Sequence, residues 1–122
     1  MKISSQKPRV LVVEDEYLIR MLLEDMLDEL GYEVVGAVGS IAEASTLATS
    51  GEFDAAILDV NLDGEEIYPV ADILAARKTP FVFVTGYGEQ SLPERYRGRP
   101  TLQKPFQADQ LKSTLGILVA QA

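Results

Sequence analysis

Short apolar runs alternate along the chain with segments whose apolar residues recur at helical spacing. The runs are continuous rather than alternating, which is typical of parallel strands that are buried on both faces. They predict strands at residues 9–13 (RVLVV), 33–38, 53–58, 81–84 (FVFV) and 101–103.

The first two predicted helices have clear ends. Apolar residues of the segment 19–30 share one helical face, and Gly31 follows as a C′ glycine. The second helix starts after Ser40, which opens a capping box with Glu43, and it stops at Gly51.

The second half of the chain is less regular. A third helix should begin near Tyr68, because Pro69 fits only the first helical turn, and a last amphipathic helix should span about residues 108–119. Between the last two strands the segment 86–100 combines Gly and Pro with few apolar residues. We therefore expect the fourth helix to be degenerate or missing there, with a loop or one irregular turn in its place.

Strands that alternate with helices predict an α/β fold with right-handed crossovers and one doubly wound, five-stranded parallel sheet. If the strand order is 2-1-3-4-5, the flavodoxin-like order, functional groups gather beyond the carboxyl ends of the strands. These ends carry Glu14, Asp15, Asp59, Thr85 and Lys104.

Composition narrows the possible functions. The 122 residues suit a single domain over 1–122, and the net charge of −8 disfavours binding to nucleic acid or to an anionic membrane. The chain has no Cys and no His, so any metal has to be held by oxygen. With neither a signal peptide nor an apolar run long enough to span a bilayer, we expect a cytoplasmic location.

The carboxylates at the strand ends indicate a metal site. Glu14, Asp15 and Asp59 should converge on one pocket, where Mg²⁺ would relieve their repulsion. In a phosphoryl-transfer site of this kind Asp59 is placed as the nucleophile, Lys104 as the cation that meets a phosphoryl oxygen, and Thr85 as a hydroxyl donor. Each residue alone has an ordinary structural interpretation, but the coincidence of all five favours a site.

The chain resembles the receiver domain of a two-component response regulator over nearly its whole length. The resemblance rests on four segments, VVEDE (12–16), ILDVNLDG (57–64), FVTG (83–86) and KPF (104–106). It implies that Asp59 is the phosphoacceptor and that Asn61 adds its backbone carbonyl to the Mg²⁺ ligands.

The same resemblance implies a function in phosphorelay signal transduction. A histidine kinase or a phosphotransfer protein would donate the phosphoryl group, and the chain, with no output domain, would signal by contact with a downstream protein. It would not be an enzyme that acts on external substrates.

Two positions depart from the family pattern. Receivers usually carry an aromatic residue three positions before the Lys, and here that position is Thr101. The segments YPVA (68–71) and FVTGY (83–87) instead resemble a subgroup of single-domain receivers with a divergent fourth helix. Tyr87 is therefore a candidate for part of the switching role.

Three alternatives remain at this stage. The segment 59–64 matches the first half of an EF-hand loop, but Val70 stands where that loop needs a bidentate Glu. A haloacid-dehalogenase-like phosphatase would have Asp where this chain has Asn61. A phosphorylation-independent interaction module would not need the acidic residues.

The segment from Gly88 to Pro100 is predicted to be the most mobile part of the chain, because few apolar residues hold it. Its three arginines, Arg95, Arg97 and Arg99, form the one dense basic group in the sequence. They are interpreted either as a docking surface or as solvated loop residues.

Overall fold

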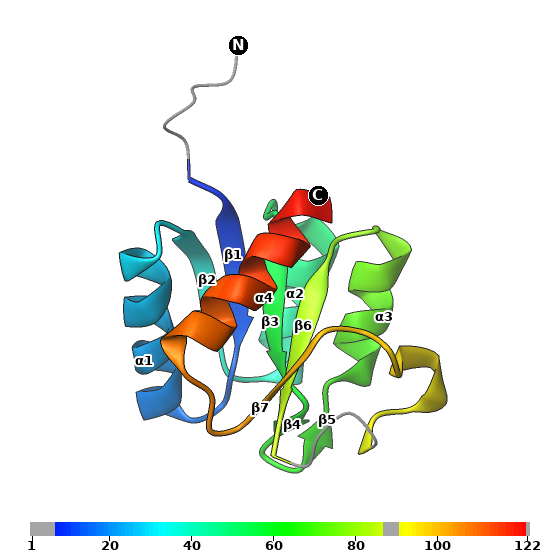
Figure 1. Ribbon diagram of the computed structural model, residues 1–122. Coiled ribbons are helices and arrows are strands. Elements are labelled where there is room, and N and C mark those ends of the chain that lie inside the picture. Colours follow the sequence, from blue (N-terminus) through cyan, green and yellow to red (C-terminus); the bar gives the residue numbers. More distant parts are fainter. Residues whose placement is uncertain (1–6, 87–90, 122) are drawn as a thin grey trace.

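The computed structural model describes residues 7–86 and 91–121, and its centre is a five-stranded parallel sheet. The strands lie in the order β2-β1-β3-β6-β7 (Figure 1). In chain order this is the predicted 2-1-3-4-5 arrangement, so the flavodoxin-like fold is confirmed. The strands are Arg9–Val13 (β1), Glu33–Val38 (β2), Ala55–Asp59 (β3), Phe81–Thr85 (β6) and Thr101–Gln103 (β7).

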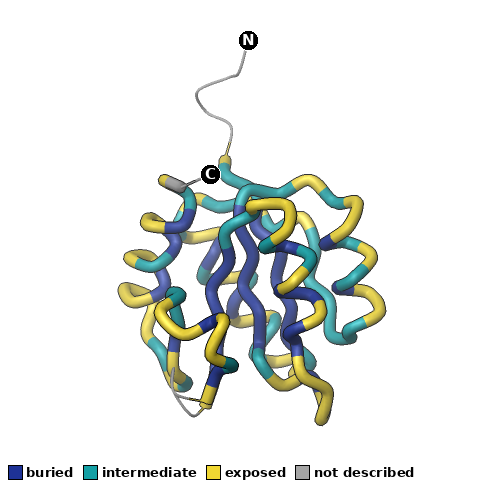
Figure 2. The backbone as a smooth tube through the Cα atoms, turned by 90° about the vertical axis from the view of Figure 1, so that its right-hand side faces the viewer, coloured by how far each residue is buried: buried dark blue, intermediate teal, exposed yellow. Residues whose placement is uncertain are grey.

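Two helices cover each face of this sheet. On one face α1 (Tyr17–Glu29) and α4 (Ala108–Gln121) close one apolar core, and on the other α2 (Ile41–Ser50) and α3 (Tyr68–Ala76) close a second (Figure 1). The central strands β1, β3 and β6 are buried from both sides (Figure 2), which explains why their sequences are apolar without alternation. Within the described residues no helix combines the length and the apolar character needed to cross a membrane.

The predicted capping residues are found at the ends of the first two helices. At the start of α2 the Ser40 hydroxyl accepts a hydrogen bond from the backbone N–H of Glu43 at 3.2 Å. After α1, Gly31 adopts a φ of +93°, and the N–H of Tyr32 donates to the carbonyl of Leu27 at 2.9 Å. This is a Schellman motif, which needs a residue that tolerates the left-handed conformation.

The segment after β3 is a short hairpin. β4 (Asn61–Leu62) and β5 (Glu65–Glu66) pair in antiparallel fashion. The turn residues Asp63 and Gly64 have φ angles of +50° and +89°. An Asp-Gly pair favours such a turn of type I′, so the dipeptide was the signal to read.

The predicted loss of the fourth helix is confirmed for the described residues. Between β6 and β7, residues 92–100 contain one 3₁₀ turn, η2 (Glu94–Tyr96), and no α-helix. Thr101, which stands where receivers usually carry an aromatic, donates its hydroxyl to the carbonyl of Arg99 at 3.0 Å. Tyr87, the proposed substitute, lies outside the described residues, as do residues 88–90.

Residues 91–100 are anchored better than their composition suggested. Tyr96 is buried and packs against Tyr68, Phe81 and Phe83, with ring centroids 6.1, 5.9 and 5.2 Å away. Leu92 is also buried, in the same apolar core as the buried side chains of α3. The premise that little holds this segment was therefore wrong for its described part, because two well-placed side chains outweigh a low apolar count.

The three arginines of this segment do not form a free basic patch. Arg95 pairs with Asp72 at 3.2 Å, and Arg99 stacks over the ring of Phe81 at 4.7 Å. Arg97 donates to the carbonyl of Leu92 at 3.2 Å. Arg95 and Arg97 are nevertheless exposed, which agrees with the interpretation as solvated loop residues. The interpretation as a docking surface stays a prediction.

Candidate functional site

Adjacent strands bring three carboxylates together at one end of the sheet. β1 and β3 are neighbours, with Val13 paired to Leu58, so Glu14 and Asp15 follow β1 beside Asp59 at the end of β3. One oxygen from each carboxylate lies within 4.8 Å of the others. The predicted convergence of these residues is therefore present in the structure.

The three acids differ in their access to water. Glu14 and Asp59 are 1% and 6% exposed, whereas Asp15 is only partly buried. The Oε1 atom of Glu14 is buried and accepts no hydrogen bond within the described residues. The other oxygen, Oε2, accepts from the backbone N–H of Glu16 at 3.1 Å, but a buried carboxylate with one unpaired oxygen still needs a counter-ion close by.

Lys104 supplies part of that compensation. Its Nζ lies 3.3 Å from Glu14 Oε1 and 3.4 Å from Asp59 Oδ2. Its backbone N–H donates to the carbonyl of Thr85 at 2.8 Å, which ties the end of β7 to the end of β6. One ammonium facing three carboxylates leaves the pocket with an excess of negative charge.

The pKa values follow from this crowding. Burial raises the pKa of Glu14 from 4.5 to about 7, and the neighbouring Asp59 carboxylate adds to the effect. Burial also raises the pKa of Asp59, although Lys104 opposes the shift. Burial alone would lower the pKa of Lys104, but Asp59 and Glu14 outweigh it and the pKa is raised.

Asn61 and Thr85 complete the group of predicted site residues. Both line a cavity of about 210 Å³ beside Asp59. The backbone N–H of Asn61 faces Asp59 Oδ1 at 3.4 Å, and its side chain accepts from the N–H of Gly64 at 2.7 Å. Thr85 is buried at the end of β6.

Two contacts at the site were not foreseen from the sequence. The N–H of Asp63 in the hairpin turn donates to Asp15 Oδ2 at 3.1 Å, and Arg20 Nη1 donates to the carbonyl of Glu14 at 2.9 Å. A Cβ at Gly39 would lie 2.6 Å from that guanidinium nitrogen, so the glycine leaves room for Arg20. Each contact joins residues from different elements, and hydrophobic periodicity does not reveal such partners.

The donor set fits Mg²⁺. Three convergent carboxylates, one of them partly open to water, offer the hard oxygen ligands and the room for metal-bound water that this ion prefers. The Ca²⁺-loop alternative is wrong, because residues 61–66 form a tight hairpin and Val70 is fully buried.

The comparison with protein families agrees with this architecture. The family model of the response regulator receiver domain matches residues 10–116, and the chain belongs to this family. Receiver domains bind Mg²⁺ in an acidic pocket and are in general signalling modules of two-component systems.

Two of the curated relatives are longer regulators. The transcriptional regulatory protein PdtaR of Mycobacterium tuberculosis is 38% identical over 117 residues, which cover 93% of this chain and 57% of PdtaR. The phyllosphere-induced regulator PhyR of Methylorubrum extorquens is 36% identical over 102 residues, covering 80% of this chain and 38% of PhyR. The chain thus spans 57% of PdtaR and 38% of PhyR, less than two thirds of either relative.

Solved structures include a relative of similar length. The solution structure of SdrG from Sphingomonas melonis Fr1 has a TM-score of 0.82 and 48% identity, covering 96% of this chain and 99% of that chain. A BeF3-activated conformation of SdrG from Pseudomonas melonis Fr1 has a TM-score of 0.78 and 50% identity, with 91% and 95% covered.

Proposed function

We propose that this receiver accepts a phosphoryl group on Asp59 from a histidine kinase or a histidine phosphotransfer protein. The observation that carries the proposal is the contact of a buried Asp59 with Lys104 inside the acidic cluster. A buried carboxylate beside a lysine can act as a nucleophile once a cation shields the negative charge of the incoming phosphoryl group.

The roles of the side chains follow from their positions. Asp59 attacks phosphorus as the bond between phosphorus and the donor imidazole breaks. Glu14, Asp15, Asp59 and the backbone carbonyl of Asn61 hold Mg²⁺, which when bound neutralises charge on the phosphoryl oxygens. Lys104 moves from Asp59 to one phosphoryl oxygen, and the Thr85 hydroxyl donates to another.

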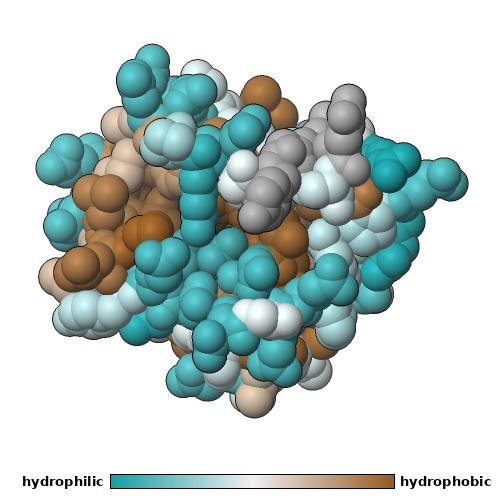
Figure 3. Space-filling model, turned by 90° about the horizontal axis from the view of Figure 1, so that it is seen from below, coloured by the Kyte–Doolittle hydropathy of each residue, from teal (hydrophilic) through white to brown (hydrophobic). Residues whose placement is uncertain are grey.

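None of the 122 residues is a His, so the phosphohistidine donor lies outside them. A surface for it lies on α1, beside the acidic pocket. Four large apolar side chains on the first turns of α1 are exposed, and Figure 3 shows hydrophobic surface gathered on that side of the polar centre. They are Tyr17, Leu18, Met21 and Leu22.

An apolar cavity extends this surface toward the site. It has a volume of about 190 Å³ and lies between Ile19 and Met26 of α1 and Phe106, with Lys104 at its edge. A partner that covers α1 therefore brings its own reactive group close to Lys104 and Asp59. Exposed apolar clusters of this kind mark protein contacts.

A charge introduced on α1 should block phosphotransfer from a protein donor but not from a small-molecule donor. We expect Leu18→Glu, at a side chain that is 77% exposed, to slow phosphotransfer from a partner histidine kinase by about tenfold or more. Phosphorylation by acetyl phosphate should not change. The control is Ile117→Glu on α4, which introduces the same charge at a side chain that is 58% exposed. Equal slowing with both donors would show that α1 acts on the site itself rather than on docking.

The signal would leave the receiver by contact with a downstream protein. The net charge of −8 leaves little that would attract nucleic acid. The identity of both partners can be found by phosphotransfer profiling and by capture with the phosphorylated form.

Beryllofluoride tests the proposed function directly. With Mg²⁺ it should bind at Asp59 as a phosphoryl mimic and shift the backbone amide NMR signals of Asp59, Thr85 and Lys104. The activated form of SdrG named above was obtained with this mimic. An unchanged spectrum at saturation would instead favour a phosphorylation-independent interaction module.

A further inference from the structure

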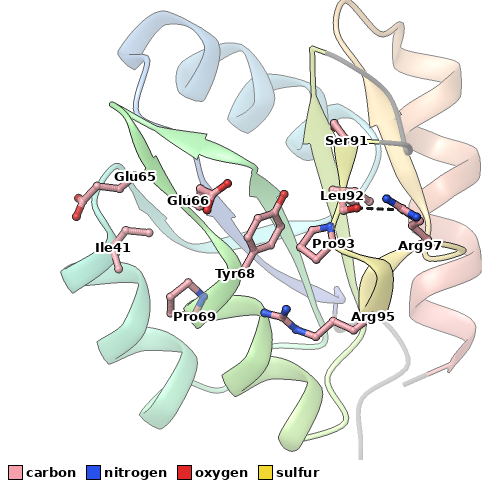
Figure 4. A pocket seen from close by; sticks show the side chains of 10 residues that line it. All are labelled: Ile41, Glu65, Glu66, Tyr68, Pro69, Ser91, Leu92, Pro93, Arg95 and Arg97. Carbon is pink, nitrogen blue, oxygen red and sulfur yellow. Dashed lines mark hydrogen bonds between the residues drawn. The ribbon is translucent and has the colours of Figure 1, made fainter.

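Two cavities meet at one wall beside the proposed phosphoacceptor. The first is the 210 Å³ cavity that contains Asp59 and Thr85. The second is an open groove of about 740 Å³ between the hairpin, α3 and residues 91–97 (Figure 4). Glu66 and Tyr68 line both cavities, so they separate the phosphoacceptor pocket from the groove.

The wall carries a negative charge on the pocket side. In Figure 4 the Glu66 carboxylate and the Tyr68 hydroxyl point toward the same space, whereas Glu65 points away from it. Glu65 lines the groove but not the pocket of Asp59. Burial raises the pKa of Tyr68 and the Glu66 charge raises it further, which agrees with their proximity.

The hairpin fixes Glu66 in this position. Glu66 is paired directly opposite Asn61 in the antiparallel register. The N–H of Ile67 donates to the carbonyl of Val60 at 3.0 Å, and the N–H of Asp63 holds Asp15 at the other end of the hairpin. Successive residues of a strand face opposite sides, which explains why Glu65 and Glu66 diverge.

We propose that Glu66 limits the lifetime of the phosphoryl group on Asp59. The inference rests on the proposed function, because it concerns the fate of the group that Asp59 accepts. Two effects act in the same direction. The Glu66 carboxylate repels the dianionic phosphoryl group in the shared cavity, and it accepts a hydrogen bond from the water that attacks phosphorus.

Hydrolysis is a simple exchange of bonds. The oxygen of the attacking water forms a bond to phosphorus, and the bond between phosphorus and the Asp59 oxygen breaks. The bonding pair of that bond stays on the Asp59 carboxylate, and both protons of the water leave with the phosphate as H₂PO₄⁻. No oxidant or other reactant is needed.

The test compares two neighbouring glutamates. Glu66→Gln and Glu65→Gln remove the same charge from the same short strand, but only Glu66 lines the cavity of Asp59. Each variant and the unaltered protein are phosphorylated with acetyl phosphate and Mg²⁺, freed of donor, and followed by intact-protein mass spectrometry. The Mg²⁺ affinity of each is measured by calorimetry.

We expect Glu66→Gln to lengthen the half-life of the phosphorylated protein by about three- to tenfold. This is the effect on the hydrolysis rate expected from removing one partly solvated charge near the phosphoryl group. Glu65→Gln should leave the half-life unchanged, and neither variant should change Mg²⁺ affinity. Equal half-lives for Glu66→Gln and the unaltered protein, or equal lengthening in both variants, would overturn this inference alone. Failure of the unaltered protein to take up phosphate would overturn the proposed function and this inference with it.

Discussion

We expect Asp59→Asn to abolish phosphate incorporation from acetyl phosphate, with no adduct detectable by mass spectrometry. Asn preserves the shape of the side chain at the end of β3 but lacks a nucleophilic carboxylate. Because Asp59 is almost fully buried in the cluster with Glu14 and Asp15, the change also removes one of three crowded carboxylates. The variant should therefore fold normally and melt at the same temperature as the unaltered protein or above it.

Asp63→Asn is the matched control for this prediction. Asp63 is an exposed carboxylate in the hairpin turn, and its contact with Asp15 is made by the backbone N–H, which Asn retains. Asn also tolerates the left-handed backbone of this turn. Phosphate incorporation in Asp63→Asn should remain normal. Phosphate found on another residue of the unaltered protein would remove Asp59 from the proposed role.

The location of the site could be predicted because it depends on topology. Once the apolar runs are taken as parallel strands in the flavodoxin-like order, Glu14, Asp15 and Asp59 have to meet, since they follow neighbouring strands. Thr85 and Lys104 follow from the next two strands along the sheet. The roles of these residues remain predictions until the chemistry is measured.

Side-chain contacts between distant segments could not be predicted in this way. The Tyr96 hydroxyl donates a hydrogen bond to Asp72, which lies 24 residues away, and no sequence pattern links the two residues. Leu22 shows the same limit within one helix. Its spacing places it on the predicted apolar face of α1, yet it is 57% exposed.

The metal-free protein should be less stable at pH 8 than at pH 5.5. The pKa of Glu14 is about 7 in the folded chain, against 4.5 as its ordinary value, so the folded state holds a proton that the unfolded state has lost. Stability from this group is complete below pH 4.5 and is lost as the pH rises through about 7. The loss in the free energy of unfolding should be on the order of 1–3 kcal/mol, measured by urea denaturation. Lys104 does not alter this window, because its pKa is raised from 10.5 and it stays charged throughout.

Mg²⁺ should reverse this loss, since a cation among Glu14, Asp15 and Asp59 favours the charged carboxylates of the folded state. At 10 mM Mg²⁺ we expect a gain of about 1–3 kcal/mol at pH 8 and a smaller one at pH 5.5. Asp15→Asn should remove most of the gain, although its side-chain oxygen can still accept the hydrogen bond from Asp63. If Asp15→Asn were stabilised by Mg²⁺ as strongly as the unaltered protein, Asp15 would not be a Mg²⁺ ligand and the proposed metal site would be wrong.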